Sequence, residues 1–142
     1  MNPELIFVYG TLKEGLCNAG ANQGRRVPGR HVTVDAWPLM IVVNGRWPWL
    51  LPRRGEGHRV AGELYEVDAA ALARMDALER IDEPGQYERH RIAVVDDADG
   101  TRREAWVYFG TEAGFVARGG GHIGPLDEYR LEHQECHVPF GE

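Results

Sequence analysis

Short runs of β-branched and aromatic residues, each closed by glycine, proline or an Asn-Gly or Asp-Gly pair, constrain the fold of this chain most strongly. Turn pairs of this kind favour antiparallel hairpins. The runs predict strands at residues 5–9, 31–36, 39–43, 47–51, 60–67, 87–95 and 103–109. Residues 13–29 and the segment after Gly110 are rich in glycine and polar residues, and we expect them to be irregular apart from at most a short helix around residues 17–23.

A single segment has a clear helical pattern. Asp68 offers an N-cap to a helix that runs to about Ile81, and Pro84-Gly85 ends that region. One helix among six or seven strands predicts an α+β domain with a curled, largely antiparallel sheet, because an alternating βαβ layout would require more helices. We expect residues 1–142 to form a single domain.

Size, charge and cysteine content narrow the class of protein. A chain of 142 residues can bury a sufficient core without disulfide or metal staples. Cys17 and Cys136 have no framework spacing, which favours a reducing compartment. The net charge is −6 and the arginines are scattered, which argues against a nucleic-acid surface and favours a small-molecule partner.

The longest apolar runs, residues 5–9 and 39–43, are far shorter than the roughly 20 residues that span a bilayer, so no membrane segment is expected. The first residues also lack a basic segment before the apolar run. We therefore expect no secretory signal and a cytoplasmic location. The sequence carries no indication of the oligomeric state.

Glu79 breaks the pattern of the predicted helix. With Leu72 set at zero and about 100° per residue, Glu79 falls near 340°, inside the apolar stripe, whereas Asp76 at about 40° is expected to reach solvent. A carboxylate in that stripe must be paired, hydrogen-bonded or shifted in pKa, because burial disfavours its charged form. It indicates either a general acid or base, or a structural carboxylate paired with Arg89 or Arg91.

The segment Tyr9-Gly10-Thr11-Leu12 follows the first predicted strand. Consecutive backbone N–H groups at such a turn can form a concave site for an anion. The alternative is a plain turn in which the glycine only supplies backbone freedom. The segment is not a P-loop, because the Gly-to-Gly-Lys spacing is absent.

Three other patterns are weaker. Residues 47–52, Trp-Pro-Trp-Leu-Leu-Pro, either wall a pocket or pack at the rim of the core. His133, Cys136 and His137 could offer metal ligands, but they lie within five residues and lack a distant partner pair. Cys17 could act as a nucleophile, yet no histidine is indicated as its base.

Several motifs occur in one order along the chain. They are Phe-Val-Tyr-Gly-Thr-Leu-Lys at 7–13, then Gly15 and Asn18, Pro-Trp-Leu-Leu at 48–51, Gly-Glu-Leu-Tyr-Glu-Val-Asp at 62–68, Leu78-Glu79 and Tyr-Glu-Arg at 87–89. Together they resemble the gamma-glutamylcyclotransferase-like superfamily, most closely its gamma-glutamylamine cyclotransferase branch, over residues 5–109. The resemblance implies a small mixed, mostly antiparallel β-barrel with flanking short helices.

The resemblance also implies the site. In such enzymes the Tyr-Gly-Thr-Leu loop binds the α-carboxylate and α-amine end of the glutamyl group, and a glutamate on a helix acts as the base. The corresponding residues here are Tyr9, Gly10, Thr11 and Leu12 for substrate binding and Glu79 for catalysis, with Tyr87 orienting the substrate or Glu79. Glu83 and Glu63 are the next carboxylates to test if Glu79 is not the base.

The implied reaction converts a γ-glutamyl amino acid or γ-glutamylamine to 5-oxoproline and a free amine, a lyase or acyl-transfer type of step with no metal or other cofactor. Members act on different γ-glutamyl compounds, glutathione among them. Residues 119–121 and the His/Cys tail have no counterpart in the family pattern, and no residue identifies the leaving group. The alternatives are a non-catalytic binding module for γ-glutamyl metabolites and a metal-dependent hydrolase that uses the tail.

Overall fold

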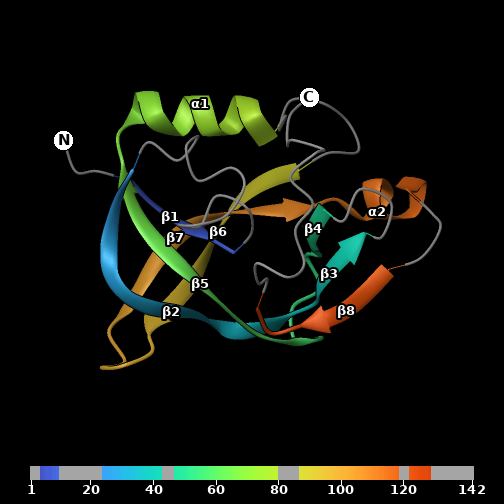
Figure 1. The fold of residues 1–142 in the computed structure, drawn as a ribbon, viewed down its shortest axis with the longest axis horizontal. Coiled ribbons are helices and arrows are strands. Elements are labelled where there is room, and N and C mark those ends of the chain that lie inside the picture. The colour runs from blue at the N-terminus through green and yellow to red at the C-terminus, as the bar shows by residue number, and fades with distance from the viewer. Residues whose placement is uncertain (1–3, 10–23, 43–46, 80–86, 119–121, 129–142) are drawn as a thin grey trace.

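The computed structural model describes residues 4–9, 24–42, 47–79, 87–118 and 122–128. Eight strands and two helices lie within these residues (Figure 1). In chain order they are β1 (Glu4–Val8), β2 (Arg25–Trp37), β3 (Leu39–Val42), β4 (Trp47–Leu50), β5 (His58–Val67), α1 (Ala69–Glu79), β6 (Tyr87–Asp96), β7 (Arg102–Gly110), α2 (Glu112–Arg118) and β8 (His122–Leu126).

Five of these strands close into a barrel in the order β1-β5-β2-β6-β7. Neighbouring strands in this order run antiparallel. The barrel is closed by a parallel pairing between β1 and β7, at Ile6 and Trp106. The mixed, mostly antiparallel barrel predicted by the resemblance is therefore confirmed.

The other three strands form a small sheet in the order β4-β3-β8. Strands β3 and β4 pair antiparallel with Val42 opposite Trp47, as a hairpin requires, while the predicted Asn44-Gly45 turn lies outside the described residues. Figure 1 shows this sheet and α2 beside the barrel. The fully buried Trp49 connects the two sheets, because its indole N–H donates to the carbonyl of Thr111 beyond the end of β7.

Alternation along the barrel strands produces two cores. Side chains on one face fill the barrel, among them Phe7, Leu64, Val94, Ala105 and Val107. Side chains on the other face contact helix α1, and this outer cluster contains Ile6, Val8, Tyr65, Val67, Tyr108, Ala71, Leu72 and Met75. In Figure 1, α1 lies across the outside of the barrel.

Helix α1 begins where the sequence predicts. The Asp68 carboxylate accepts a hydrogen bond from the backbone N–H of Ala71 at 2.7 Å, which is an N-cap. The part of the predicted apolar stripe that the structure describes is confirmed, because Ala71, Leu72 and Met75 are buried against the barrel. The helix ends at Glu79, two residues before the predicted Ile81.

Two expectations about irregular segments are wrong. Strand β2 starts at Arg25, inside the stretch expected to be irregular, and pairs with β5 from its first residue. The segment after Gly110 forms α2 and β8; Thr111 caps the helix by accepting from the N–H of Gly114 at 3.1 Å. Strand β8 exists because it pairs with β3, a tertiary contact that local composition does not reveal.

Within the described residues, no helix has both the length and the apolar character needed to cross a bilayer.

Candidate active site

Tyr9 directly follows β1, at the entrance to the predicted binding loop. Its side chain is buried, and its hydroxyl donates a hydrogen bond to the backbone carbonyl of Tyr108 in β7. This contact ties the end of β1 to the neighbouring strand of the barrel. The remaining loop residues, Gly10, Thr11 and Leu12, lie outside the described residues.

Tyr108 also holds helix α1. Its side chain is on the outer face of the barrel, and its hydroxyl donates to a carboxylate oxygen of Asp76 at 2.7 Å. One residue of β7 therefore contacts both parts of the predicted site: its carbonyl binds Tyr9 and its hydroxyl binds the helix that carries Glu79. Asp76 is three residues before Glu79, so the bond fixes the last turn of α1 against the barrel.

The environment of Asp76 differs from the sequence expectation. Its side chain is only 18% exposed and lies 3.2 Å from Nε of Arg89, where the helical wheel predicted contact with solvent. The Arg89 guanidinium also lies over the ring of Trp106, 4.2 Å from its centre. The prediction for Asp76 is wrong because a helical wheel treats the helix as isolated. In the structure Arg89 of β6 lies beside Asp76 and covers it.

Glu79 is the last residue of α1, and its side chain lies outside the described residues. The partners proposed for it as a structural carboxylate have contacts elsewhere. Arg89 pairs with Asp76, and Arg91 pairs with Glu4 at 3.3 Å. Both arginines therefore have a carboxylate partner among the described residues, and a pairing of either with Glu79 stays a prediction.

Tyr87 begins β6 and is buried. Its ring lies 4.6 Å from the ring of Trp49, and its hydroxyl donates to the carbonyl of Pro48. Trp49, Leu50 and Leu51 are also buried, so this part of the Trp-Pro-Trp-Leu-Leu-Pro segment is core. Tyr87 thus joins the barrel to the small sheet.

Glu63, named above as a carboxylate to test after Glu79, lies in β5 as the sequence predicts. It lies opposite Val8 in the β1–β5 register, next to Tyr9, and its side chain is 15% exposed. The Tyr65 hydroxyl donates to it at 2.8 Å, and Arg26 lies 3.7 Å away. The sequence shows Glu63 only as one of two glutamates in the run 60–67, and its contacts with Tyr65 and Arg26 emerge from the structure.

The possible metal ligands of the tail, His133, Cys136 and His137, lie outside the described residues, as does Cys17. In the described ranges, no group of three or more His, Cys, Asp or Glu side chains could hold a metal ion.

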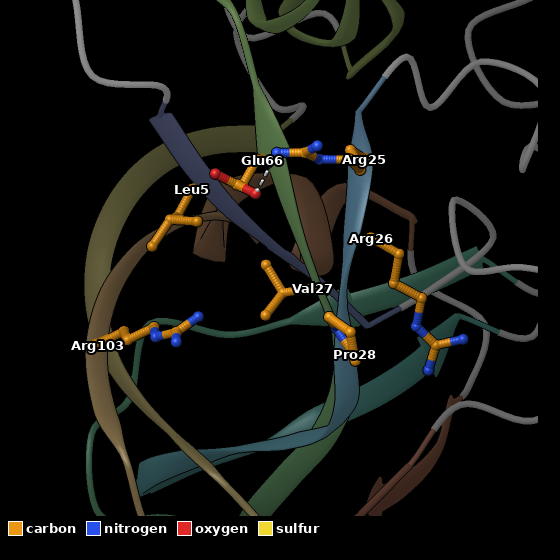
Figure 2. A pocket seen from close by; sticks show the side chains of 7 residues that line it. All are labelled: Leu5, Arg25, Arg26, Val27, Pro28, Glu66 and Arg103. Carbon is orange, nitrogen blue, oxygen red and sulfur yellow. Dashed lines mark hydrogen bonds and ion pairs between the residues drawn. The ribbon is translucent and has the colours of Figure 1, made fainter.

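A hollow of about 660 Å³ opens at the end of the barrel where β1 begins (Figure 2). Leu5, near the start of β1, lines it, whereas Tyr9 follows the end of the same strand. Four residues of extended chain separate the two positions by about 13 Å. The hollow therefore lies away from Tyr9, the one residue of the predicted loop that the structure describes.

Comparison with known proteins places these features in a family. A family model described as "Gamma-glutamyl cyclotransferase, AIG2-like" matches residues 6–135. Rat gamma-glutamylaminecyclotransferase is 43% identical over 94 residues, which cover 63% of this chain and 62% of the rat protein. The bovine protein of the same name is 39% identical over 108 residues, covering 72% of this chain and 63% of that protein. The chain thus spans somewhat less than two thirds of these two relatives.

The crystal structure of a mouse AIG2-like protein has a similar fold. It superposes with a TM-score of 0.68 at 36% sequence identity, and the match covers 77% of this chain and 78% of the mouse chain. The family match over residues 6–135 and the fold shared with the mouse protein lead to the same assignment. The chain belongs to the gamma-glutamyl cyclotransferase, AIG2-like family.

Proposed function

We propose that this protein is a γ-glutamyl cyclotransferase that converts a γ-glutamyl amino acid or γ-glutamylamine to 5-oxoproline and a free amine. Glu79 is the general acid and base in this proposal. Tyr9, Gly10, Thr11 and Leu12 bind the α-carboxylate and α-amine end of the glutamyl group, and Tyr87 is a positioning residue. The names of the rat and bovine relatives support an amine as the leaving group.

The observation that carries the proposal is the double contact of Tyr108. Its backbone carbonyl accepts from Tyr9 and its hydroxyl donates to Asp76 of α1. The start of the loop and the last turn of the helix are thereby held on one strand. An acid–base group and a binding turn must be fixed relative to each other for an intramolecular reaction, because most of the rate gain comes from holding the reacting atoms in place.

The chemistry balances without a further reactant. The α-nitrogen attacks the γ-carbonyl carbon, a new C–N bond closes the five-membered ring, and the bond to the leaving nitrogen breaks. Glu79 takes one proton from the α-ammonium group before the attack and a second from the same nitrogen as the ring closes. It passes both in turn to the leaving nitrogen, which departs as an ammonium ion. Each turnover therefore releases one 5-oxoproline and one amine and restores the carboxylate.

Tyr87 acts through packing in this proposal. Its hydroxyl bond to Pro48 and its contact with Trp49 fix the start of β6, and Arg89, two residues later, pairs with Asp76. Tyr87 and Tyr108 thus support the same end of α1 from two strands. This arrangement favours a positioning role for Tyr87.

A panel of γ-glutamyl compounds tests the function. We expect the purified protein to release 5-oxoproline from at least one of γ-glutamyl-ε-lysine, γ-glutamyl-alkylamines, γ-glutamyl dipeptides and glutathione, measured by chromatography. Saturable binding across the panel without product would contradict the proposal and favour a binding module. Loss of product on treatment with a chelator would instead favour the metal-dependent hydrolase.

A further inference from the structure

The hollow at the far end of the barrel combines an apolar wall with cationic groups. Leu5 and Val27 lie on the strand face that fills the barrel, and both pack against the inner core while remaining partly exposed. Figure 2 shows them between Arg103 on one side and the Arg25–Glu66 pair on the other. The inner core closes the barrel beyond them, so the hollow is a recess and not a channel.

The charges of the recess are unequal. Arg25 lies 3.3 Å from Glu66, which balances it. Arg103 has no carboxylate oxygen within 4.0 Å among the described residues. The charge of Arg103 is felt by His31 in the barrel interior. Burial lowers the pKa of His31 most, and the positive charge of Arg103 lowers it further, whereas Asp96 raises it. Asp99 balances Arg103 in part: the backbone N–H of Thr101 lowers the pKa of the Asp99 carboxyl most, and the charge of Arg103 adds to that shift. The lining still has an excess of positive charge, with Arg25, Arg26 and Arg103 against Glu66, in a chain whose net charge is −6.

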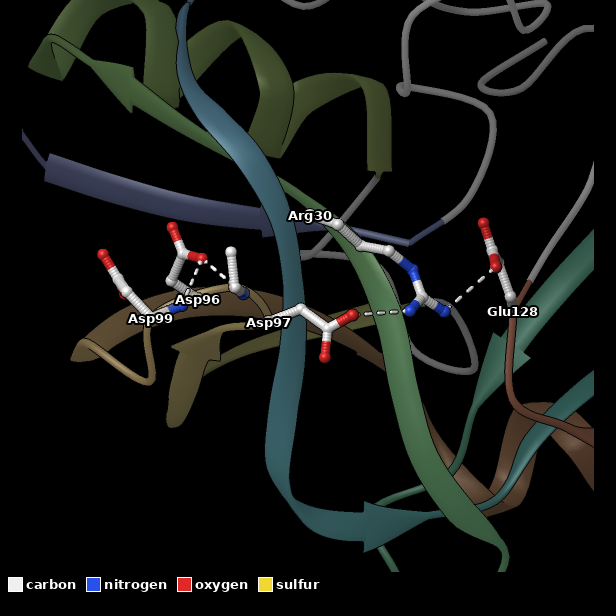
Figure 3. A network of polar contacts seen from close by, with 6 residues as sticks. Arg30, Asp96, Asp97, Asp99 and Glu128 are labelled. Atoms are coloured by element: carbon white, nitrogen blue, oxygen red, sulfur yellow. Dashed lines mark hydrogen bonds and ion pairs between the residues drawn. The ribbon is translucent and has the colours of Figure 1, made fainter.

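The rim that carries Arg103 is fixed by polar contacts (Figure 3). Arg103 is the second residue of β7, just after the turn that leaves β6. In this turn the Asp96 carboxylate accepts from the N–H of Ala98 at 2.8 Å. Arg30 of β2 pairs with Asp97 at 2.8 Å and with Glu128 at 3.4 Å. The turn before Arg103 is thus held in place, so the backbone that carries Arg103 does not have to be ordered on binding.

We propose that this recess binds a small organic anion, a carboxylate carried on a short aliphatic chain. The aliphatic chain lies against Leu5 and Val27, and the carboxylate binds the Arg103 guanidinium. A volume of about 660 Å³ is in the range of small-molecule sites. Leu5 of the recess and Tyr9 are at opposite ends of β1, so we assign the recess an occupant other than the γ-glutamyl substrate.

The test uses hexanoate as the probe and hexan-1-ol as a ligand of equal chain length without the charge. The full chain, labelled with ¹⁵N, is titrated with each and followed by two-dimensional NMR. We expect saturable shifts of the amides of Leu5, Val27 and Arg103 with hexanoate, weaker binding of hexan-1-ol, and unchanged amides at Asp76 and Tyr108.

Two matched variants identify the cation. Arg103→Gln should weaken hexanoate binding about three- to fivefold, the worth of one exposed ion pair. Arg102→Gln removes the same charge from the neighbouring exposed position and should leave binding unchanged. The amide spectrum of each variant reports its folding. Equal binding of hexan-1-ol, equal effects of the two variants, or shifts centred on α1 would each overturn the proposal. None of these outcomes bears on 5-oxoproline release.

Discussion

Removal of the Tyr108 hydroxyl separates a positioning role from simple structural support. In Tyr108→Phe the carbonyl that accepts from Tyr9 remains, while the 2.7 Å bond to Asp76 is lost. The change is confined to a residue that is only 4% exposed. It therefore removes one of the contacts that hold the last turn of α1 and leaves the barrel closed.

The expected magnitude follows from the surroundings of Asp76. A hydrogen bond to a charged group is worth about 1.5–3 kcal/mol. Asp76 keeps Arg89 at 3.2 Å and is 18% exposed, so water can reach the vacated position. We expect a loss of about 1–2 kcal/mol in the free energy of unfolding, at the low end of that range. Urea denaturation measures it.

The effect on catalysis should exceed what this loss of stability implies. A freed last turn of α1 displaces Glu79 and not the substrate loop, so kcat should fall by about tenfold or more with little change in KM. Steady-state 5-oxoproline release on the best substrate of the panel gives both constants.

Thr33→Val is the matched control. Thr33 is wholly buried in β2, and its hydroxyl donates to the carbonyl of Asp35 and accepts from the N–H of Val60. Its loss should destabilise the protein to a similar degree, about 1–3 kcal/mol, without changing kcat. Equal kcat values for Tyr108→Phe and Thr33→Val would refute the positioning role.

Two further predictions concern packing and pH. In Gly110→Ala the new Cβ would lie 2.4 Å from the Trp49 ring, so we expect a loss of about 1–3 kcal/mol by urea denaturation, and wild-type stability would contradict the packing described. His31 is 1% exposed and has a lowered pKa, mainly through burial, so the unfolded chain takes up its proton more readily. Its contribution to stability is therefore complete above the unfolded pKa, near 6.5, and is lost as pH falls toward the lower folded value. His31→Asn should flatten this part of the stability–pH curve, and an unchanged slope would contradict it.

Much of the barrel could be predicted from the sequence, because alternation and turn pairs are local signals. The runs at residues 60–67, 87–95 and 103–109 appear as β5, β6 and β7 with shifts of a few residues at their ends. The Asp68 cap and the buried stripe of α1 were equally local. Strand β8 was missed because a five-residue segment containing glycine and proline becomes a strand only when β3 is available to pair with it.

The candidate site was predictable only in part, for a related reason. A helical wheel located Glu79 relative to the other residues of α1, but it could not show what covers each angle. Asp76 was therefore assigned to solvent, although Tyr108 and Arg89 of two barrel strands bind it. Contacts between residues distant in sequence leave no pattern in a single amino-acid sequence. The hydrogen bond from Tyr9 to Tyr108 is an example.

Glu79→Gln tests whether Glu79 is the acid and base, with Glu104→Gln, an exposed position of β7, as the matched control. We expect 5-oxoproline release by Glu79→Gln to fall by about 10²–10⁴-fold while the melting temperature changes little, and Glu104→Gln to retain the wild-type rate. Release by Glu79→Gln at the wild-type rate would contradict the account and transfer the role of the base to Glu83 or Glu63.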